Sequence, residues 1–276
     1  MYSKKLSSAE PGLIIICIDQ SGSMEESYAN GNKAQFAAMA VNRVIGEIIA
    51  ACTAGNTIKD RCWIAVIGYG AKTELEFLNP ASTLAENANT MVVKKKISDG
   101  AGGLVEVDEI MRVFVNPVAN GGTPMADAFR EAVQGATGFI SKFPNSFPPV
   151  VINITDGEPY TGDSVEAAMQ DARIEAEKLT QLKTSDGNVI LMNAHISNAG
   201  AGKIELPSNK QGIGENVLAE FLYDISSVLP DNMVLGAQHA GFNVQQGQGA
   251  RGFVFNAESE TLIKLLNFGS NPSGLR

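Results

Sequence analysis

The chain has 276 residues, of which 44% are hydrophobic and 18% are charged. That length and composition suffice for one large α/β domain that buries its core without disulfides. The formal net charge of −9 argues against nucleic acid as a partner, because a surface that neutralises phosphates needs an excess of lysine and arginine.

The first third of the chain predicts alternating strands and helices. Residues 13–18 are a continuous apolar run, which predicts a strand buried on both faces, and residues 33–52 carry apolar side chains at helical spacing. Residues 62–67 and 73–78 predict two further strands. The short link Gly68-Tyr69-Gly70 between them predicts a hairpin, which makes the second of these an antiparallel edge strand.

The rest of the chain continues this alternation. Helices are predicted at 124–142, with Thr123 as N-cap and Pro124 in the first helical position, and at 164–182, 215–228 and 259–266. Strands are predicted at 150–155, 189–196 and 252–255. The pattern predicts one domain over residues 1–276, an α/β fold with a doubly wound, mostly parallel sheet and helices on both faces, with insertions at about 80–118 and 198–250.

The cysteines and the apolar runs bear on location. Cys17, Cys52 and Cys62 lack metal-ligand spacing, and Cys17 lies inside an apolar run as a small buried hydrophobe. No apolar stretch of signal-peptide length precedes Pro11, and the run at 13–18 is too short to span a bilayer. We therefore expect a cytoplasmic protein without membrane association.

Three polar clusters stand where a parallel sheet binds ligands, beyond the carboxyl ends of its strands. Asp19, Ser21 and Ser23 follow the first strand, Thr123 precedes the long helix within Gly-Gly-Thr-Pro-Met, and Asp156 follows the strand at 150–155. Each cluster alone could be a turn or a helix cap. Together they predict one site.

In this order the clusters resemble the von Willebrand factor A (vWA) family. The metal-ion-dependent adhesion site (MIDAS) of that family is written Asp-x-Ser-x-Ser, then a Thr, then an Asp, and all five positions match here. The order of strands and helices is also similar, from about residue 12 to 268. The matching positions are Asp19, Ser21, Ser23, Thr123 and Asp156.

The resemblance implies a vWA/Rossmann-like fold that binds Mg²⁺, with Mn²⁺ or Ca²⁺ as alternatives. It implies Ser21, Ser23 and Thr123 as direct ligands, with Asp19 and Asp156 acting through water or hydrogen bonds. An inner shell of neutral hydroxyls leaves the ion's charge poorly neutralised, so that a carboxylate from outside is attracted. The expected function is a protein-binding module without catalytic residues, whose protein partner presents Asp or Glu to the metal.

The resemblance extends to intracellular bacterial members of the family, whose motif wording is similar to Asp-x-Ser-Gly-Ser-Met and Thr-Asp-Gly-Glu-Pro. Such proteins occur beside tellurite-resistance-associated genes. This implies a role in a bacterial stress-response or defence complex, with a kinase, a phosphatase or an AAA+ ATPase of the same system as partner.

Two other functions remain open. A Mg²⁺-dependent phosphatase or phosphotransferase of the haloacid dehalogenase type also places an aspartate after its first strand, but it needs a second acid where this chain has Ser21. A scaffold with a purely structural metal site is the other alternative. The sequence contains neither a P-loop nor a Gly-x-Ser-x-Gly motif.

Several further residues have two interpretations. His195 could line the ligand face, although a structural, hydrogen-bonded histidine is the commoner case, and His239 permits no interpretation. Glu25, Glu26 and Tyr28 could form the rim of a binding surface or a solvated loop, and Glu158 and Tyr160 flank Asp156 in the same way.

Overall fold

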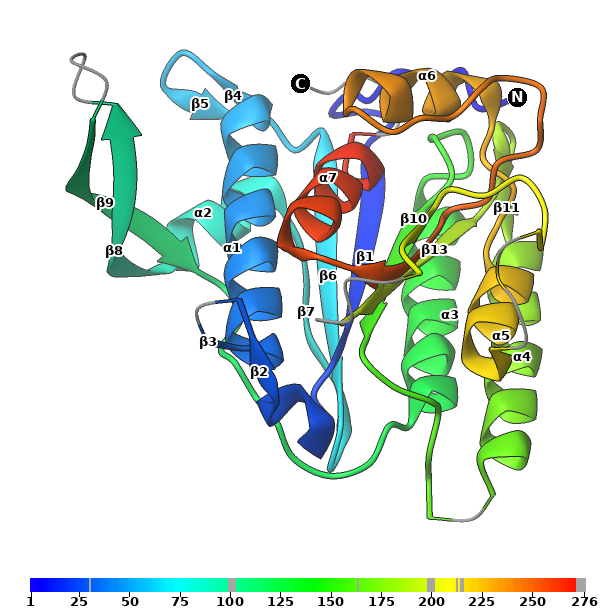
Figure 1. The fold of residues 1–276 in the computed structure, drawn as a ribbon. Helices are drawn as coiled ribbons and strands as arrows, with labels where there is room; N and C mark the ends of the chain where they lie inside the picture. Colours follow the sequence, from blue (N-terminus) through cyan, green and yellow to red (C-terminus); the bar gives the residue numbers. More distant parts are fainter. Residues whose placement is uncertain are drawn as a thin grey trace.

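The fold is built on a central seven-stranded sheet with strand order β14-β15-β13-β10-β1-β6-β7 (Figure 1). The computed structural model describes residues 1–29, 31–98, 103–162, 164–197, 202–211, 213 and 216–271. The five inner strands are parallel and the edge strands β7 and β14 are antiparallel to their neighbours. The strands are β1 (Gly12–Asp19), β6 (Cys62–Tyr69), β7 (Thr73–Pro80), β10 (Val150–Thr155), β13 (Ile190–Ile196), β14 (Ile204–Glu205) and β15 (Phe253–Ala257).

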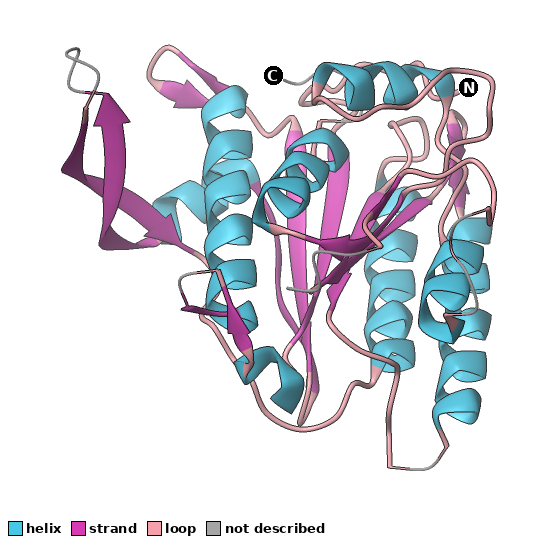
Figure 2. Cartoon of the chain, viewed as in Figure 1, coloured by secondary structure: helices cyan, strands magenta, loops and turns pink. Residues whose placement is uncertain are grey.

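Helices cover both faces of this sheet (Figure 2). All eight residues of β1 are buried, and they alternate between two cores: Ile14 and Ile16 face one, Leu13 and Ile15 the other. The first core contains α1 (Lys33–Cys52), α2 (Ala81–Asn87), α6 (Asp231–His239) and α7 (Ser259–Gly269). The second contains α3 (Met125–Lys142), α4 (Val165–Gln181) and α5 (Val217–Ile225). The predicted α/β class with a mostly parallel sheet and the antiparallel strand β7 is confirmed.

The two segments interpreted as insertions differ in structure. The first contains α2 and an antiparallel hairpin of β8 (Asn89–Ser98) and β9 (Leu104–Val113), which projects beyond α1 outside the central sheet (Figure 1). The second contains β14, α5 and α6, and its helices pack onto the two faces of the sheet. Residues 99–102, 198–201, 212, 214 and 215 of these segments lie outside the described part, including the predicted start of α5.

The loops contain a short helix and several short strands. The 3₁₀-helix η1 (Gly22–Glu25) follows β1 directly. Three two-residue ladders pair β2 (Ser27–Tyr28) with β3 (Gly31–Asn32), β4 (Thr53–Ala54) with β5 (Thr57–Ile58), and β11 (Lys183–Thr184) with β12 (Gly187–Asn188).

The helix α1 is long and apolar enough to cross a membrane by length and composition, with a mean hydropathy of 1.3 over its most apolar window. Of that window, 61% is buried inside the domain. Its buried side chains contact β1 and β6 in the first core, and the core helix of a large α/β domain meets the same test.

The path of the chain through the sheet reverses at β1. From β1 the chain runs to β6 and β7 on one side, and then returns through α3 to β10 on the other side. The topological switch point therefore lies between β1 and β10, where open α/β sheets bind their ligands.

Candidate metal-ion site

Three loops meet beyond the carboxyl ends of β1 and β10. The N–H of Gly22, in the turn after β1, donates to the carbonyl of Gly121 at 3.0 Å. Thr123 and Tyr160 exchange both of their backbone hydrogen bonds, at 2.8 and 3.0 Å. Main-chain bonds thus join the turn after β1, the loop before α3 and the loop after β10.

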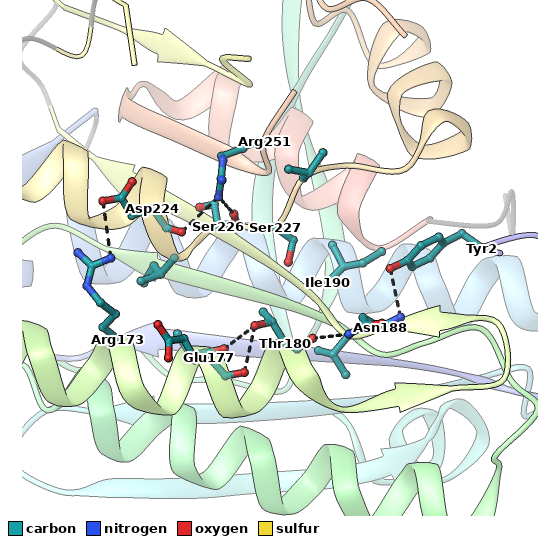
Figure 3. Close-up of a pocket in the computed structure, with 14 residues that line it drawn as sticks. Tyr2, Arg173, Glu177, Thr180, Asn188, Ile190, Asp224, Ser226, Ser227 and Arg251 are labelled. Carbon is teal, nitrogen blue, oxygen red and sulfur yellow. Dashed lines mark hydrogen bonds and ion pairs between the residues drawn. The ribbon is translucent and has the colours of Figure 1, made fainter. Parts of the chain in front are cut away.

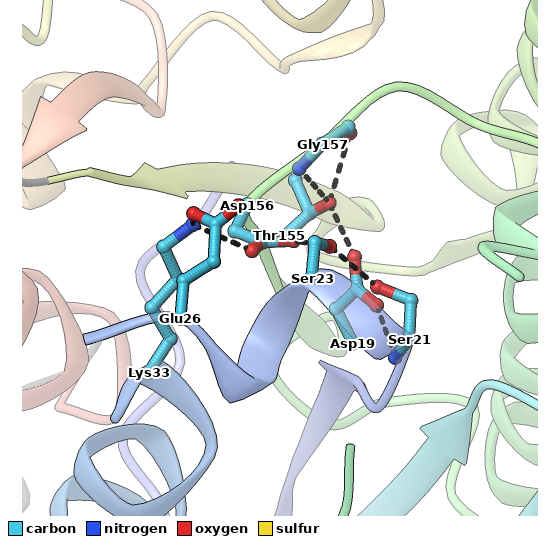
Figure 4. A network of polar contacts seen from close by, with 8 residues as sticks. All are labelled: Asp19, Ser21, Ser23, Glu26, Lys33, Thr155, Asp156 and Gly157. Atoms are coloured by element: carbon cyan, nitrogen blue, oxygen red, sulfur yellow. Dashed lines mark hydrogen bonds and ion pairs between the residues drawn. The ribbon is translucent and has the colours of Figure 1, made fainter. Parts of the chain in front are cut away.

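Polar side chains from two of these loops form one network (Figure 4). Asp19 accepts from the Ser21 N–H through Oδ1 at 2.9 Å and from the Thr155 hydroxyl through Oδ2 at 2.7 Å. The Oγ atoms of Ser21 and Ser23 lie 3.0 Å apart, and Ser23 donates to Oδ1 of Asp156 at 2.7 Å. The pairing of β1 with β10 causes this convergence, since it aligns Ile18 with Ile154 and so sets Asp19 beside Thr155.

A lysine closes the far side of this network. Lys33, the first residue of α1, donates from Nζ to Oδ2 of Asp156 at 2.8 Å and to Oε2 of Glu26 at 2.6 Å (Figure 4). Burial lowers the pKa of Lys33, but the hydrogen bonds and charges of Asp156 and Glu26 outweigh it, and the net shift of the pKa is upward. The lysine is therefore charged at neutral pH.

Burial also shapes the electrostatics of Asp19. Its removal from water is the largest effect and raises the pKa of Asp19 from 3.8 to about 6, against hydrogen bonds from Ser21 and Thr155 that lower it. The charge of Asp156 adds to the rise. The site thus holds a carboxylate whose negative charge is unfavourable as it stands and which a cation would stabilise.

Thr123 reaches the site through its backbone. It is 6% exposed, and among the described residues its hydroxyl takes no part in the hydrogen-bond network around Asp19. The prediction that Thr123 caps the long helix is wrong: α3 begins at Met125, and Pro124 at the cap makes no side-chain cap bond. The Met125 N–H donates to the Thr123 carbonyl at 2.8 Å across Pro124, whose φ of −76° and ψ of 62° form an inverse γ-turn.

The structure brings four of the five predicted residues into direct contact and places the fifth in an adjoining loop. Sequence reasoning missed Thr155 and Lys33. Thr155 could have been noticed, because it is the last residue of a buried strand and immediately precedes Asp156. Lys33 carries no such signal, since its contact with Asp156 joins residues 123 positions apart.

The donor atoms at this site are carboxylate and hydroxyl oxygens. Among the described residues, no three His, Cys, Asp or Glu side chains are grouped closely enough to hold an ion. Besides the two carboxylates, the site offers hydroxyl oxygens, and such oxygen donors suit Mg²⁺ as a hard cation. Two adjacent ligands of octahedral Mg²⁺ lie about 2.9 Å apart, from metal–oxygen distances of about 2.0–2.1 Å. The Ser21–Ser23 separation of 3.0 Å fits such an edge.

The other residues singled out in the sequence differ in their surroundings. His195 stacks on Phe255 with ring centroids 4.3 Å apart, and burial lowers its pKa to about 4, as expected for a neutral structural histidine. Tyr28 is buried at 2% exposure, with its hydroxyl on the Ala257 carbonyl, so it is not part of a rim. Tyr160 is 47% exposed beside the site, and His239 is the last residue of α6.

Two clefts flank the sheet. One of about 540 Å³ adjoins the site and is lined by Lys72, Gly121, Asp127 and Tyr160, among others. Another of about 310 Å³ lies among α4, β13 and α5 (Figure 3). Its Arg251 donates to the Ser226 carbonyl at 2.6 Å, at the end of α5, so this cation is engaged in capping a helix.

Comparison with known proteins gives no sequence match. No protein-family model and no curated protein matches the chain. Similar solved structures include the conserved hypothetical protein BatB from Bacteroides thetaiotaomicron, with 15% identity over 67% of this chain and 66% of that one and a TM-score of 0.36. The vWF domain of the pili tip protein Mfa5 from Porphyromonas gingivalis has 13% identity, covers 56% and 43%, and has a TM-score of 0.33.

Proximal thread matrix protein 1 from the mussel byssus is a third such structure, described with a zinc-occupied MIDAS motif. It has 19% identity over 70% of this chain and 37% of that one, with a TM-score of 0.37. The chain thus spans less than two thirds of the length of these proteins. At such identities and TM-scores, the function of this chain has to be argued from its own geometry.

Proposed function

We propose that this chain is a vWA domain of the intracellular bacterial type, which binds Mg²⁺ at an intact MIDAS and thereby captures an acidic side chain of a partner protein. One observation carries the proposal: at the switch point of the sheet, two hydroxyls lie 3.0 Å apart, each next to a buried carboxylate. Ser21, Ser23 and Thr123 would hold the ion, with Mn²⁺ or Ca²⁺ as substitutes. The motif resemblance supports the same ligands.

The remaining residues act as supports. Asp19 orients the turn through the Ser21 N–H, and Asp156 accepts a hydrogen bond from the Ser23 hydroxyl, which aims a lone pair of that hydroxyl away from the carboxylate. Both acids already accept two hydrogen bonds each, which favours indirect roles. When bound, the ion would supply a positive charge that attracts a carboxylate, and an Asp or Glu of the partner would complete the site.

The enzyme alternative is disfavoured by the surroundings of Asp19. A phosphatase of the haloacid dehalogenase type uses this aspartate as a nucleophile, which requires a carboxylate oxygen free to attack phosphorus. Here Asp19 is 0% exposed and both of its oxygens accept hydrogen bonds. A phosphate-ester assay with Mg²⁺ tests this directly: turnover abolished by Asp19→Asn would identify an enzyme.

The decisive experiment is affinity capture from a bacterial lysate with immobilised protein, in Mg²⁺ and again in chelator, with Ser21→Ala/Ser23→Ala as the matched control. We expect a partner retained only by the wild type in Mg²⁺. If chelator lowers the melting temperature but leaves capture intact, the metal has the purely structural role of the scaffold alternative.

The wider setting is part of the same proposal. The motif resemblance supports a kinase, a phosphatase or an AAA+ ATPase of a cytoplasmic stress-response or defence complex as the partner. Cys17, Cys52 and Cys62 are all buried, and buried thiols suit a reducing compartment.

A further inference from the structure

Lys33 is a buried cation beside the proposed metal site, but it is not one of the residues that would hold or support the ion. Its side chain is 8% exposed, and its Nζ atom lies 2.8 Å from an oxygen of Asp156, whose side chain is 0% exposed. It is also the first residue of α1, where the helix dipole disfavours a positive charge. A lysine in such a place requires nearby acids, and Asp156 is the buried one.

The two oxygens of Asp156 are divided between two partners. Oδ1 accepts from Ser23, on the side of the hydroxyl cluster, and Oδ2 accepts from Lys33, on the opposite side (Figure 4). Lys33 therefore holds the carboxylate of Asp156 on the side opposite to the hydroxyls. It also offsets the negative charge of Asp156, which contacts the predicted metal ligand Ser23.

The second acid beside Lys33 compensates much less. Glu26 lies 2.6 Å from Nζ, but its side chain is 67% exposed, and water screens an exposed charge. The buried charges at the site are thus Asp19, Asp156 and Lys33. Among the described residues of the site, Asp19 is the only buried charge that has no buried counter-charge.

We propose that Lys33 is a specificity-determining residue, which offsets Asp156 so that the site holds its ion weakly and the ion attracts an external carboxylate strongly. This inference rests on the proposed function, since it concerns the ion and the partner's acid. It predicts that removal of the positive charge of Lys33 strengthens the binding of the metal ion and weakens the binding of an external carboxylate.

The test uses the full chain and two probes, Mn²⁺ alone and acetate added to the Mn²⁺-loaded protein. Mn²⁺ affinity is measured by electron paramagnetic resonance, and acetate binding by the water-proton relaxation rate. For Lys33→Met, which keeps the length and apolar stem of the side chain, we expect about fivefold tighter Mn²⁺ binding and about fivefold weaker acetate binding, as a charge at this range should give. Lys33→Arg should resemble the wild type.

Two controls separate this effect from changes in folding and net charge. Lys94→Met removes the same charge from an exposed pair in the β8–β9 hairpin and should change neither affinity. Glu26→Gln, at an exposed position, leaves Lys33 less compensated and should weaken Mn²⁺ binding by about twofold, the direction opposite to Lys33→Met. The Glu26 variant keeps the test valid should Lys33→Met fail to fold.

The outcomes are distinct. If the wild type binds no metal at all, the proposed function fails. If the wild type binds metal and needs Ser21 and Ser23 for it, but folded Lys33→Met shows unchanged or weaker Mn²⁺ affinity, Lys33 is a purely structural residue and the inference is overturned. Equal gains in both affinities would overturn it as well.

Discussion

The hydroxyl of Thr155 lies 2.7 Å from Oδ2 of Asp19. It also lies 3.1 Å from the carbonyl oxygen of Gly157, which gives its single proton a second acceptor. A neutral amide at position 19 could therefore accept from the Ser21 N–H and donate to Thr155, while Thr155 turns its proton to Gly157. The surroundings of Asp19 tolerate asparagine by geometry.

The metal-free Asp19→Asn variant should consequently be more stable than the metal-free wild type, but it should bind Mg²⁺ more weakly. It removes a buried charge whose pKa is raised to about 6, so the metal-free protein should gain about 3 kcal/mol of unfolding free energy at neutral pH. Mg²⁺ affinity should fall by about tenfold or more. Urea denaturation and isothermal titration measure the two effects, and unchanged Mg²⁺ affinity would count against the site.

The pH dependence of metal binding follows from the same carboxyl group. Its pKa is about 6 in the folded protein against 3.8 as a reference, so between these values the folded state binds more protons than the unfolded state. Stability of the metal-free protein should therefore fall as pH rises through this window. Metal must displace the proton, so Mg²⁺ affinity should drop by up to about tenfold per unit below pH 6.

Titrations at pH 5, 6 and 7 check this prediction, with Asp19→Asn as the control. The variant lacks the titrating group and should show a flatter profile. A wild-type affinity that does not change between pH 5 and 7 would contradict the assignment.

Thr123→Val tests the third hydroxyl. The bonds of Thr123 to Tyr160 are made by its backbone, so an isosteric side chain should leave unfolding stability within about 0.5 kcal/mol of the wild type. Loss of a metal ligand should weaken Mg²⁺ binding by about tenfold or more. Thr123→Ser retains the hydroxyl and should bind nearly as the wild type does. Equal behaviour of the two variants would exclude Thr123 as a ligand.

Gly121→Ala tests the loop that carries Thr123. Gly121 has a φ of +89°, and a Cβ there would lie 2.4 Å from the backbone nitrogen of Ala71. The matched control is Gly55→Ala, at φ +60° with open space around it. We expect the control to lose about 1 kcal/mol of stability with unchanged Mg²⁺ affinity, whereas Gly121→Ala should lose more stability and weaken Mg²⁺ binding. Urea denaturation and metal titration of both variants measure this.

The core of the fold was predictable because buried parallel strands leave uniformly apolar runs. The eight residues of β1 are all buried, and so are the six of β10. The short helix α6 gave no such pattern: its nine residues include Gly236, and its position depends on packing against α7. The β8–β9 hairpin was missed because charged residues interrupt its strands, which therefore carry no continuous apolar run. Lys94 in β8, for example, pairs with Asp108 in β9.

The site was predictable to the extent that its residues follow strands. Asp19 ends the strand β1 and Asp156 directly follows the strand β10, and the switch point brings such positions together. The helix cap at Thr123 was predicted wrongly because Pro124 forms an inverse γ-turn and is not the first helical residue, so α3 begins one residue later, at Met125. Lys33 was missed because a lysine at a helix start is ordinarily solvated.

The position of the site at the reversal of the sheet has a consequence for biosynthesis. A ribosome releases Asp19 long before it has made β10, and the nascent N-terminal half therefore carries only part of the proposed ion site. The second acid, Asp156, directly follows β10 and reaches the site only when β10 pairs with β1. Metal binding at the proposed site would thus be a late event, and a truncated chain ending before residue 150 would lack Asp156.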